Sequence, residues 1–382
     1  MKVAIIGGGA SGVLCALKLK KLNNNYDITI FEASNKLLKK VSVSGNGRCN
    51  LGNLYITDEC YQNKKVINDL TTHLNDSLTF FENLGLLTFT DSEGRIYPLS
   101  KEANSVVEIL NKELFYNHVK IMNNTFVKEI KKEDSKYLVN GDAYDYVVIA
   151  TGSNAGIKLN YDPYELINNL NLKMTDLKPG LVGFKVKEDL TDIAGVRASV
   201  TVSAFGKTSQ GEIIFKEDGV SGICVMDLSI FKNDDAKILI DLLPDYTLDD
   251  LIVYMQKKMQ NDPKLKLHNL MLGTVHSKIL NIINRKYHNE LVSELTLDEI
   301  INYLKIFKSF KLTITESYDL SNAQVVCGGV SFSEVENFES KKYPNLFLVG
   351  EVLDQAGICG GYNLWFAFTT GLVVAEIING RC

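Results

Sequence analysis

A short apolar strand, a glycine-rich turn and a helix follow one another at the start of the chain and constrain its fold most. Residues 3–6 (Val-Ala-Ile-Ile) are wholly apolar, which predicts a strand buried on both faces of a parallel sheet. Residues 7–12 (Gly-Gly-Gly-Ala-Ser-Gly) form the turn, and residues 13–22 carry apolar side chains at helical spacing. A second strand over 27–31 ends at Glu32. This order predicts an α/β fold of the doubly wound type.

The glycine turn has the residue order that accommodates the pyrophosphate of a dinucleotide. Gly7 allows the tight turn, Gly9 lets the pyrophosphate approach the backbone, and Gly12 lets the helix pack on the strand. The free amides at the helix start would face the phosphates. Glu32 would accept hydrogen bonds from the adenosine ribose. The alternative is a glycine turn without a nucleotide, and the glycines do not distinguish NAD from FAD.

Two further segments of the first half could contribute to the same site. Residues 36–53 are rich in glycine, asparagine and cations, which indicates a loop along a cofactor, with Lys40 and Arg48 near phosphate or flavin oxygens. The alternative is a solvated surface loop. The apolar strand at 147–149 runs into residues 150–153 (Ala-Thr-Gly-Ser), where the carboxyl ends of such strands face the ligand crevice. A purely structural turn is the alternative there.

The last sixty residues again contain apolar strands followed by glycine-rich turns. An apolar strand over 345–349 ends on Gly350 and Glu351, and a glycine loop over 357–363 precedes the terminal helix. FAD is longer than one glycine turn can hold. Glu351 could accept hydrogen bonds from ribityl hydroxyls, and the loop would let backbone approach the isoalloxazine ring. The start of the helix would stabilise an anionic reduced flavin. A helix entry without a ligand is the alternative.

Between these two glycine-rich ends the residue pattern changes. Alternating strands punctuated by glycines predict an antiparallel β unit over 186–245, and apolar periodicity predicts helices over 246–320. We therefore expect a discontinuous FAD-binding domain over 1–185 and 321–382, and an insertion domain over 186–320. Within the first domain, the patterns predict helices over 61–86 and 101–117, strands over 119–121 and 125–130, and a hairpin over 137–146.

Composition excludes several classes of protein. The net charge of −5, without a long basic run, disfavours a general nucleic-acid binder but leaves a local basic groove open. No secretory signal is visible, and the longest apolar stretch, 364–378, is interrupted by polar residues, so we expect a cytoplasmic protein that does not span a membrane. Seven cysteines without a C-x-x-C pair indicate reduced thiols. The five histidines lack metal-ligand spacing, and we assign none a catalytic role.

Together these motifs resemble the BaiN-type family of flavoproteins, also described as NAD(P)/FAD-dependent oxidoreductases or aminoacetone-oxidase-like proteins. The resemblance covers nearly the whole chain, and its most specific segments are 44–53 (Ser-Gly-Asn-Gly-Arg-Cys-Asn-Leu-Gly-Asn) and 350–364. It implies a Rossmann-like FAD domain split by a β-barrel-like part and a helical part. It also implies FAD contacts at Ser11, Glu32, Lys40, Arg48, Val127, Glu351, Asp354, Asn363 and Leu364, with Val127 near the adenine. With the turn residues, the expected cofactor-binding set adds Gly7, Gly9, Ala10, Gly12, Gly47, Ala150, Thr151, Gly152, Gly350 and Gly361.

The favoured function is a flavin-dependent oxidoreductase that exchanges a hydride between flavin N5 and a small organic substrate. Only one dinucleotide turn is evident, so NADH or NADPH would visit the flavin transiently as donor. Family analogy suggests an enone or steroid-like ketone as acceptor, with dioxygen as another. Arg95, Tyr97, Tyr362 and Cys359 are catalytic candidates only because they lie in motif segments, and packing or cofactor contact explains each more readily.

Two other functions remain open at this stage. Some tRNA-methylating enzymes have this style of FAD domain, so an RNA-modifying flavoprotein is one alternative. A basic face on the insertion domain would support it, built from Lys257, Lys258, Lys264, Lys266, Lys278, Arg285 and Lys286. The same residues are what an ordinary solvated helix surface contains. A non-enzymatic flavin-binding redox protein is the other alternative.

Overall fold

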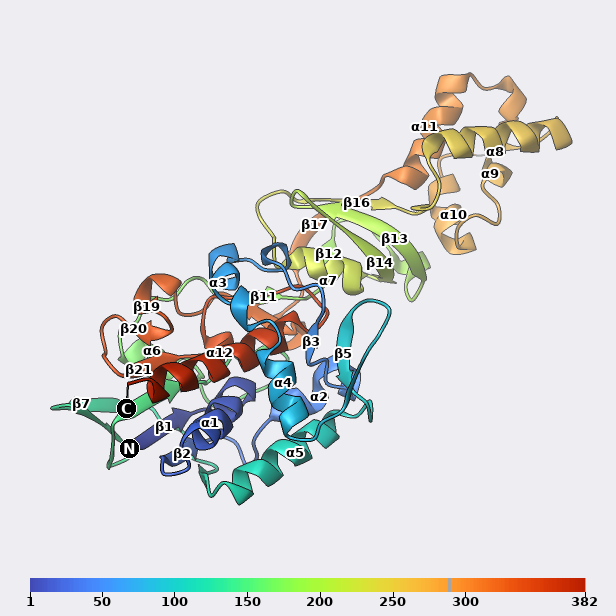
Figure 1. Cartoon of the computed structure of the whole chain (residues 1–382). Helices are drawn as coiled ribbons and strands as arrows, with labels where there is room; N and C mark the ends of the chain where they lie inside the picture. Colours follow the sequence, from blue (N-terminus) through green and yellow to red (C-terminus); the bar gives the residue numbers. More distant parts are fainter. Residues whose placement is uncertain (288–289, 382) are drawn as a thin grey trace. The chain divides into compact units, whose positions relative to one another are not determined.

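A computed structural model describes residues 1–287 and 290–381, and the chain divides into two units (Figure 1). Unit 1 comprises residues 1–178 and 325–382, and unit 2 comprises residues 179–324. His288 and Cys382, which entered the residue-type arguments above, lie outside the described residues.

A seven-stranded sheet in the order β19-β20-β21-β10-β1-β2-β6 forms the centre of unit 1. β1 pairs in parallel with β2 on one side and with β10 on the other, and β10 pairs in parallel with β21. The doubly wound parallel sheet expected from the sequence is therefore present. Its strands are β1 (Lys2–Ile6), β2 (Asp27–Phe31), β6 (Lys120–Met122), β10 (Tyr146–Ile149), β19 (Val335–Glu336), β20 (Glu339–Ser340) and β21 (Leu346–Leu348).

Alternate residues of β1 enter two separate cores. Val3 and Ile5 pack with residues of α1 (Ala10–Leu22), α5 (Ala103–Tyr116) and α12 (Tyr362–Asn379) on one face. Ala4 and Ile6 pack on the other face with residues of β8 (Lys136–Val139) and α6 (Glu165–Asn169). Burial on both faces explains why β1 is apolar throughout. α12 is also apolar around most of its circumference because it is buried, and it packs along α1 (Figure 1).

Smaller elements complete unit 1. β3 (Gly52–Asn53), β5 (Arg95–Pro98) and β4 (Thr88–Thr90) form one antiparallel sheet, and β7 (Ile130–Glu133), β8 and β9 (Asp142–Tyr144) form another. The hairpin expected over 137–146 is present as β8 and β9, but Tyr146 already belongs to β10. The remaining elements are α2 (Lys39–Gly47), α3 (Lys64–Asp69), α4 (Asp76–Asn83) and β18 (Val325–Cys327).

Unit 2 contains a closed six-stranded barrel in the order β12-β15-β14-β13-β16-β17. Its strands are β12 (Phe184–Val186), β13 (Arg197–Ala204), β14 (Lys207–Lys216), β15 (Gly219–Ser221), β16 (Lys237–Asp241) and β17 (Phe310–Ser317). Its helices are α7 (Ile223–Ser229), α8 (Leu248–Asn261), α9 (Leu267–Leu270), α10 (Ser277–Asn284) and α11 (Leu297–Lys308). Barrel and helices share one hydrophobic core. β11 (Lys178–Gly180) spans the boundary between the units.

Three expectations from the sequence need correction. Residues 246–320 are not helical throughout, because β17 lies within them and pairs with β16 and β12 to close the barrel. For the same reason unit 2 begins before 186, since β12 is a barrel strand. The strand expected over 125–130 reduces to the start of β7. Residues 125–129 cross the end of β2 instead, where the Thr125 amide donates to the Glu32 carbonyl at 2.8 Å.

The segment 36–53 also differs from the simple loop expected. Its first part forms α2, which loses helical geometry at Ser44, Gly45 and Asn46. Gly45 and Asn46 have positive φ values of 57° and 56°, so the chain reverses there before entering β3. The reversal brings the asparagine-rich end of the segment beside the start of α12, because an added Cβ on Gly361 would lie 2.5 Å from Asn50 Oδ1.

Candidate cofactor site

The first glycine turn joins β1 to α1 at the carboxyl end of the sheet. Gly7 has a φ of +111°, and a Cβ added there would lie 2.2 Å from the carbonyl oxygen of Ala150, at the end of β10. A Cβ on Gly12 would lie 2.1 Å from the Gly7 carbonyl oxygen. These two glycines are therefore needed for close backbone approach. Thr151 and Gly152 continue from Ala150, so the residues expected on both strands meet at one edge.

Gly9 has the opposite environment. It is the N-cap of α1, its φ of −83° suits any residue, and an added Cβ would meet no atom within 4 Å. No side chain caps the helix at this position. Among the described residues, none accepts from the amides of Ala10 and Ser11 in the first turn of α1, so an anionic group could accept from them.

Glu32, at the end of β2, holds the glycine turn in place through hydrogen bonds from backbone amides. Its Oε2 accepts from the Gly8 amide at 2.9 Å, and its Oε1 accepts from the Ser34 amide at 2.7 Å. Each carboxylate oxygen keeps a second lone pair for a ligand hydroxyl. Glu32 therefore combines a structural role, which the sequence did not indicate, with the capacity to bind a ribose.

A second polar cluster joins the middle of the chain to its end. Lys40 Nζ lies 2.8 Å from Glu351 Oε2 and donates to Ser153 Oγ at 2.9 Å. Glu351 Oε1 accepts from the Val326 amide at 3.3 Å. Burial, and then the negative charge of Glu351, raises the pKa of Tyr164, so its hydroxyl stays protonated at neutral pH. Ser153 belongs to the turn expected over 150–153, whereas Tyr164 is a site neighbour that no sequence motif marks.

Ser11 in α1 lies between two glycines of the C-terminal segment. A Cβ on Gly350 would lie 2.6 Å from Ser11 Oγ, and a Cβ on Gly371 in α12 would lie 2.3 Å from the Ser11 carbonyl oxygen. The Gly350 amide also donates to Thr370 Oγ1 in α12 at 3.0 Å. The opening turn, the Gly350–Glu351 turn and the last helix therefore form one packed structure.

The start of α12 is built by a glycine and an asparagine. Gly361, with a φ of +98°, is the N-cap. Asn363 accepts from the Gly357 amide and donates to the Gly357 carbonyl, both at 2.8 Å, so its side chain closes the glycine loop. The Asp354 amide donates to the Val330 carbonyl at 3.0 Å, and Leu364 packs against the core shared by α1 and α12. Asn363 is thus primarily an organiser of the loop.

The four catalytic candidates lie around this glycine loop, since Asn53 of β3 donates to the Gly360 carbonyl at 3.1 Å and β3 pairs with β5. Arg95 binds the carboxylates of its own turn, Asp91 and Glu93, at 2.8 and 2.7 Å. These contacts account for Arg95 without a catalytic role.

Tyr97 and Tyr362 are both buried in aromatic contacts. Tyr97 stacks on Phe89, and the Arg48 guanidinium lies 4.9 Å from the centre of the Tyr97 ring. The Tyr362 ring meets Tyr61 edge-on with 6.0 Å between ring centres. Cys359 is partly exposed. Gly47 precedes Arg48 with a positive φ of 78° and open space around it. None of these four candidates stands out as an acid or base.

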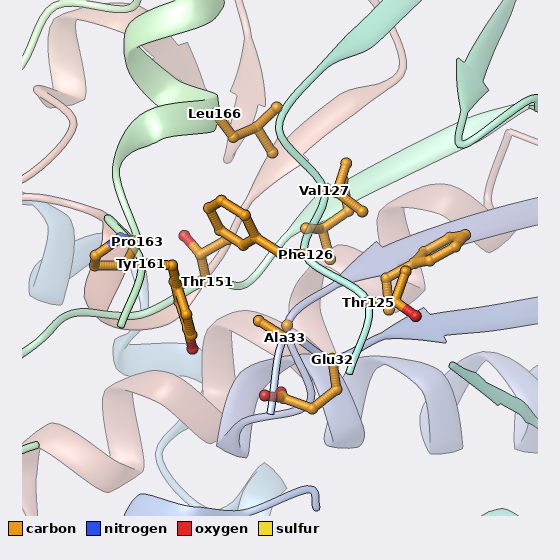
Figure 2. Close-up of a pocket in the computed structure, with 12 residues that line it drawn as sticks. Glu32, Ala33, Thr125, Phe126, Val127, Thr151, Tyr161, Pro163 and Leu166 are labelled. Atoms are coloured by element: carbon orange, nitrogen blue, oxygen red, sulfur yellow. The ribbon is translucent and has the colours of Figure 1, made fainter. Parts of the chain in front are cut away.

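The residues present fit an elongated FAD. Six buried side-chain oxygen atoms among residues 1–287 and 290–381 lack a hydrogen-bond partner. Ser77 Oγ and Thr369 Oγ1 lie within helices α4 and α12, and the other four are Thr151 Oγ1, Asn154 Oδ1 and the Tyr164 hydroxyl, which follow β10, and Asn50 Oδ1 at the start of α12. Buried polar groups are normally paired, so each of these four marks a position where a ligand can complete the structure. A small cavity of about 40 Å³ lies beside Glu32 and is also lined by Val127 and Thr151, whose side chains are labelled in Figure 2. Val127 and Glu32 thus line the same cavity, and contact of Val127 with an adenine stays a prediction.

Comparisons with known proteins match this chain over nearly its whole length. A family model described as the HI0933-like protein Rossmann domain matches residues 1–377. A 3-dehydro-bile acid delta(4,6)-reductase of Clostridium scindens is 31% identical over 100% of this chain and 99% of its own. A ribosomal RNA dihydrouridine synthase of Haemophilus influenzae is 25% identical over 98% of each chain.

Solved structures share the fold at low identity. A 3-ketosteroid delta1-dehydrogenase from Sterolibacterium denitrificans has a TM-score of 0.52 at 12% identity, covering 100% of this chain and 99% of its own. A flavocytochrome c3 fumarate reductase has a TM-score of 0.51 at 13% identity, covering 100% of this chain and 78% of its own.

Helix length and hydropathy bear on membrane insertion. Within the described part of the chain, none of the helices combines the length and the apolar character that crossing a bilayer requires.

The family match, the full-length reductase relative and the Rossmann-type sheet agree. The chain is a member of the HI0933-like Rossmann family and an FAD-dependent oxidoreductase, as its resemblance to the BaiN-type flavoproteins indicated.

Proposed function

We propose that this enzyme reduces a carbon–carbon double bond that is activated by a neighbouring carbonyl group in a small organic molecule. The observation that carries the proposal is chemical. The bile acid delta(4,6)-reductase and the ribosomal RNA dihydrouridine synthase, named for very different substrates, both add hydrogen to a carbon–carbon double bond. A chain related to both along its full length is expected to retain that reaction type.

The chain's own residues would hold the cofactor in three places. The open face at Gly9 and the first amides of α1 would bind the pyrophosphate. Glu32 would bind the adenosine ribose, and the Lys40–Glu351 pair lies along the same edge of the sheet. The start of α12, with Gly361 and the unpaired side-chain oxygen Asn50 Oδ1, would lie against the isoalloxazine ring. When bound, FAD supplies hydride transfer at N5.

Electrostatics at the start of α12 would favour reduction of the flavin by its donor, the half-reaction that precedes reduction of the substrate. A helix N-terminus carries partial positive charge and unpaired amides, which stabilise negative charge placed against them. NADH or NADPH would serve as a transient donor, since the sequence contains a single dinucleotide turn.

A polynucleotide substrate is the second candidate, and the dihydrouridine synthase relative favours it. The structure uses two of the seven cations proposed for a basic face in internal contacts. Lys258 donates to the Leu270 carbonyl at 2.9 Å, and Arg285 pairs with Asp192. This weakens the basic-face argument. The full-length reductase relative speaks against a flavin protein without catalytic activity.

The test begins with the visible spectrum of the purified protein. We expect bound flavin that bleaches on anaerobic addition of NADH or NADPH. Reoxidation is then followed with a steroid 4-en-3-one, a uridine-containing RNA or dioxygen. Faster reoxidation by the enone than by dioxygen supports the proposal, and turnover of the RNA alone selects the second candidate. A protein that stays colourless after incubation with FAD, or reduced flavin that neither organic acceptor reoxidises, contradicts both.

A matched pair of variants tests the cofactor placement. Gly9→Ala adds a methyl group where no protein atom lies within 4 Å, so the fold is kept while the pyrophosphate is obstructed. Gly380→Ala adds the same group at the exposed end of α12 and serves as control. We expect flavin loss in the first variant alone, with equal melting temperatures of the two apoproteins.

A further inference from the structure

Tyr55 is an exposed tyrosine beside the glycine loop that precedes α12. It is 62% exposed, and Leu54 before it is 60% exposed. Asn53 holds this segment to the loop, because its side-chain oxygen accepts from the Tyr55 amide at 2.9 Å and its side-chain nitrogen donates to the Gly360 carbonyl at 3.1 Å. Two large side chains thus lie open next to the segment that the proposed function places against the isoalloxazine ring.

The Tyr55 ring keeps a defined position although it is exposed. It packs on the turn between β4 and β5, because a Cβ added to Gly94 would lie 2.6 Å from the ring. The Leu54 amide donates to the Gly94 carbonyl at 2.9 Å, and the Tyr55 carbonyl accepts from the Cys60 thiol at 3.7 Å. Backbone and ring are both held, so the side chain can present its polar group at a fixed place.

The Tyr55 hydroxyl is the group that this arrangement leaves unused. Within residues 1–287 and 290–381, no group hydrogen-bonds it. Polar side chains nearby already have partners. The Tyr61 hydroxyl donates to the Tyr362 carbonyl at 2.8 Å, and Arg95 pairs with two carboxylates of its own turn. An exposed phenol that is held in place and has no partner can donate to a ligand.

Reduction of a carbonyl-activated double bond needs such a donor. When hydride adds to the β-carbon, the electron pair of the double bond moves onto the carbonyl oxygen, which becomes an enolate. A hydrogen-bond donor at that oxygen stabilises the negative charge as it develops. The α-carbon then takes a proton from water, the carbonyl re-forms, and the donor keeps its own proton. The reductant is the reduced flavin that the proposed function supplies.

We propose that Tyr55 is a catalytic residue whose hydroxyl donates a hydrogen bond to the carbonyl oxygen of the substrate, while its ring and Leu54 contact the apolar carbon skeleton. This inference rests on the proposed function and deepens it. The substrate must lie against the flavin ring to receive hydride, and Tyr55 is joined through Asn53 to the loop expected beside that ring. An exposed apolar pair at this place gives the carbon skeleton a surface to cover.

The test separates the two half-reactions of the FAD-loaded enzyme by rapid mixing. Tyr55→Phe removes only the hydroxyl. We expect reoxidation of its reduced flavin by a saturating steroid 4-en-3-one to slow about a hundred-fold, the size of effect that loss of one such donor gives. Reduction by NADH or NADPH and reoxidation by dioxygen should stay within about two-fold of wild type, because neither places charge on a carbonyl oxygen.

Binding without turnover gives a second readout. The same enone is titrated into oxidised enzyme, and the shift of the flavin absorbance is the signal. Tyr55→Phe keeps the ring and should bind within about three-fold of wild type, since the uncharged carbonyl gains little from the donor. Tyr55→Ala loses the ring as well and should bind the enone about five- to thirty-fold more weakly.

Tyr116→Phe is the matched control, because Tyr116 is also 62% exposed and belongs to α5 rather than to the segment after β3. It should leave all three rates and the enone affinity unchanged. The catalytic role of Tyr55 is overturned if the enone reoxidises Tyr55→Phe at the wild-type rate, or if reoxidation by dioxygen slows by the same factor. Wild type whose reduced flavin is not reoxidised by the enone would overturn the proposed function on which the inference rests.

Discussion

Gly371→Ala tests whether the close packing of α1 on α12 sustains the cofactor site. A Cβ at position 371 would lie 2.3 Å from the Ser11 carbonyl oxygen and 3.3 Å from the Cys15 amide nitrogen. These are backbone atoms, so one helix must move. We take the cost of this overpacking as about 3 kcal/mol, the upper part of the usual range. Removing a helical glycine returns about 1 kcal/mol.

The net expectation is a loss of about 2 kcal/mol in the free energy of unfolding, which lowers the melting temperature by about 4–8 °C for a unit of this size. Because Ser11 is in the first turn of α1, the displaced helix also carries the pyrophosphate amides away, and we expect partial loss of flavin. Thermal unfolding is followed by the release of flavin fluorescence and, in the apoprotein, by circular dichroism.

Gly380→Ala is the matched control for this experiment. Its φ of −69° suits alanine, and the nearest atom to an added Cβ lies 3.5 Å away in ordinary contact. We expect no destabilisation and full flavin occupancy. If Gly371→Ala has the same melting temperature as Gly380→Ala and retains its flavin, then the close packing of α1 on α12 at Gly371 does not sustain the cofactor site.

Three further predictions follow from single contacts. Tyr61→Phe removes the hydroxyl that donates to the buried Tyr362 carbonyl at 2.8 Å, and should lower the free energy of unfolding by about 1–2 kcal/mol in a urea titration. An unchanged free energy of unfolding would show that this hydrogen bond does not stabilise the fold. Burial raises the pKa of Cys49 to about 12, so this thiol should resist iodoacetamide at pH 8 in the native protein and react after unfolding, as read by mass spectrometry. Arg381 lowers the pKa of Glu339 below its usual 4.5, so the pair adds stability above that pH and loses it as the pH falls through the lowered value. Arg381→Met should therefore lower the melting temperature slightly at pH 7, and the difference from wild type should shrink as the pH falls below 4.5. A difference that stays constant over that range would contradict the assignment.

The local elements of the cofactor domain were predictable from sequence. The apolar run of β1, the glycines at positions 7, 9 and 12, and Glu32 at the end of β2 lie close together along the chain, and their roles follow from backbone sterics and burial periodicity. Sequence patterns also located α12 and the barrel strands with glycines between them. They misassigned β17, whose eight residues form a strand because β12 and β16 pair with it from distant parts of the chain.

What only the tertiary structure decided is which distant side chains meet. Lys40 pairs with Glu351 across 311 positions of sequence, and Ser11 lies between Gly350 and Gly371. Phe126 and Tyr161 line the cavity beside Glu32 from two loops that no motif marks. Short-range periodicity reports the burial of one element at a time, whereas these contacts depend on how the faces of several elements pack together. The sequence by itself determined that a dinucleotide turn exists, and the packing determined which residues surround it.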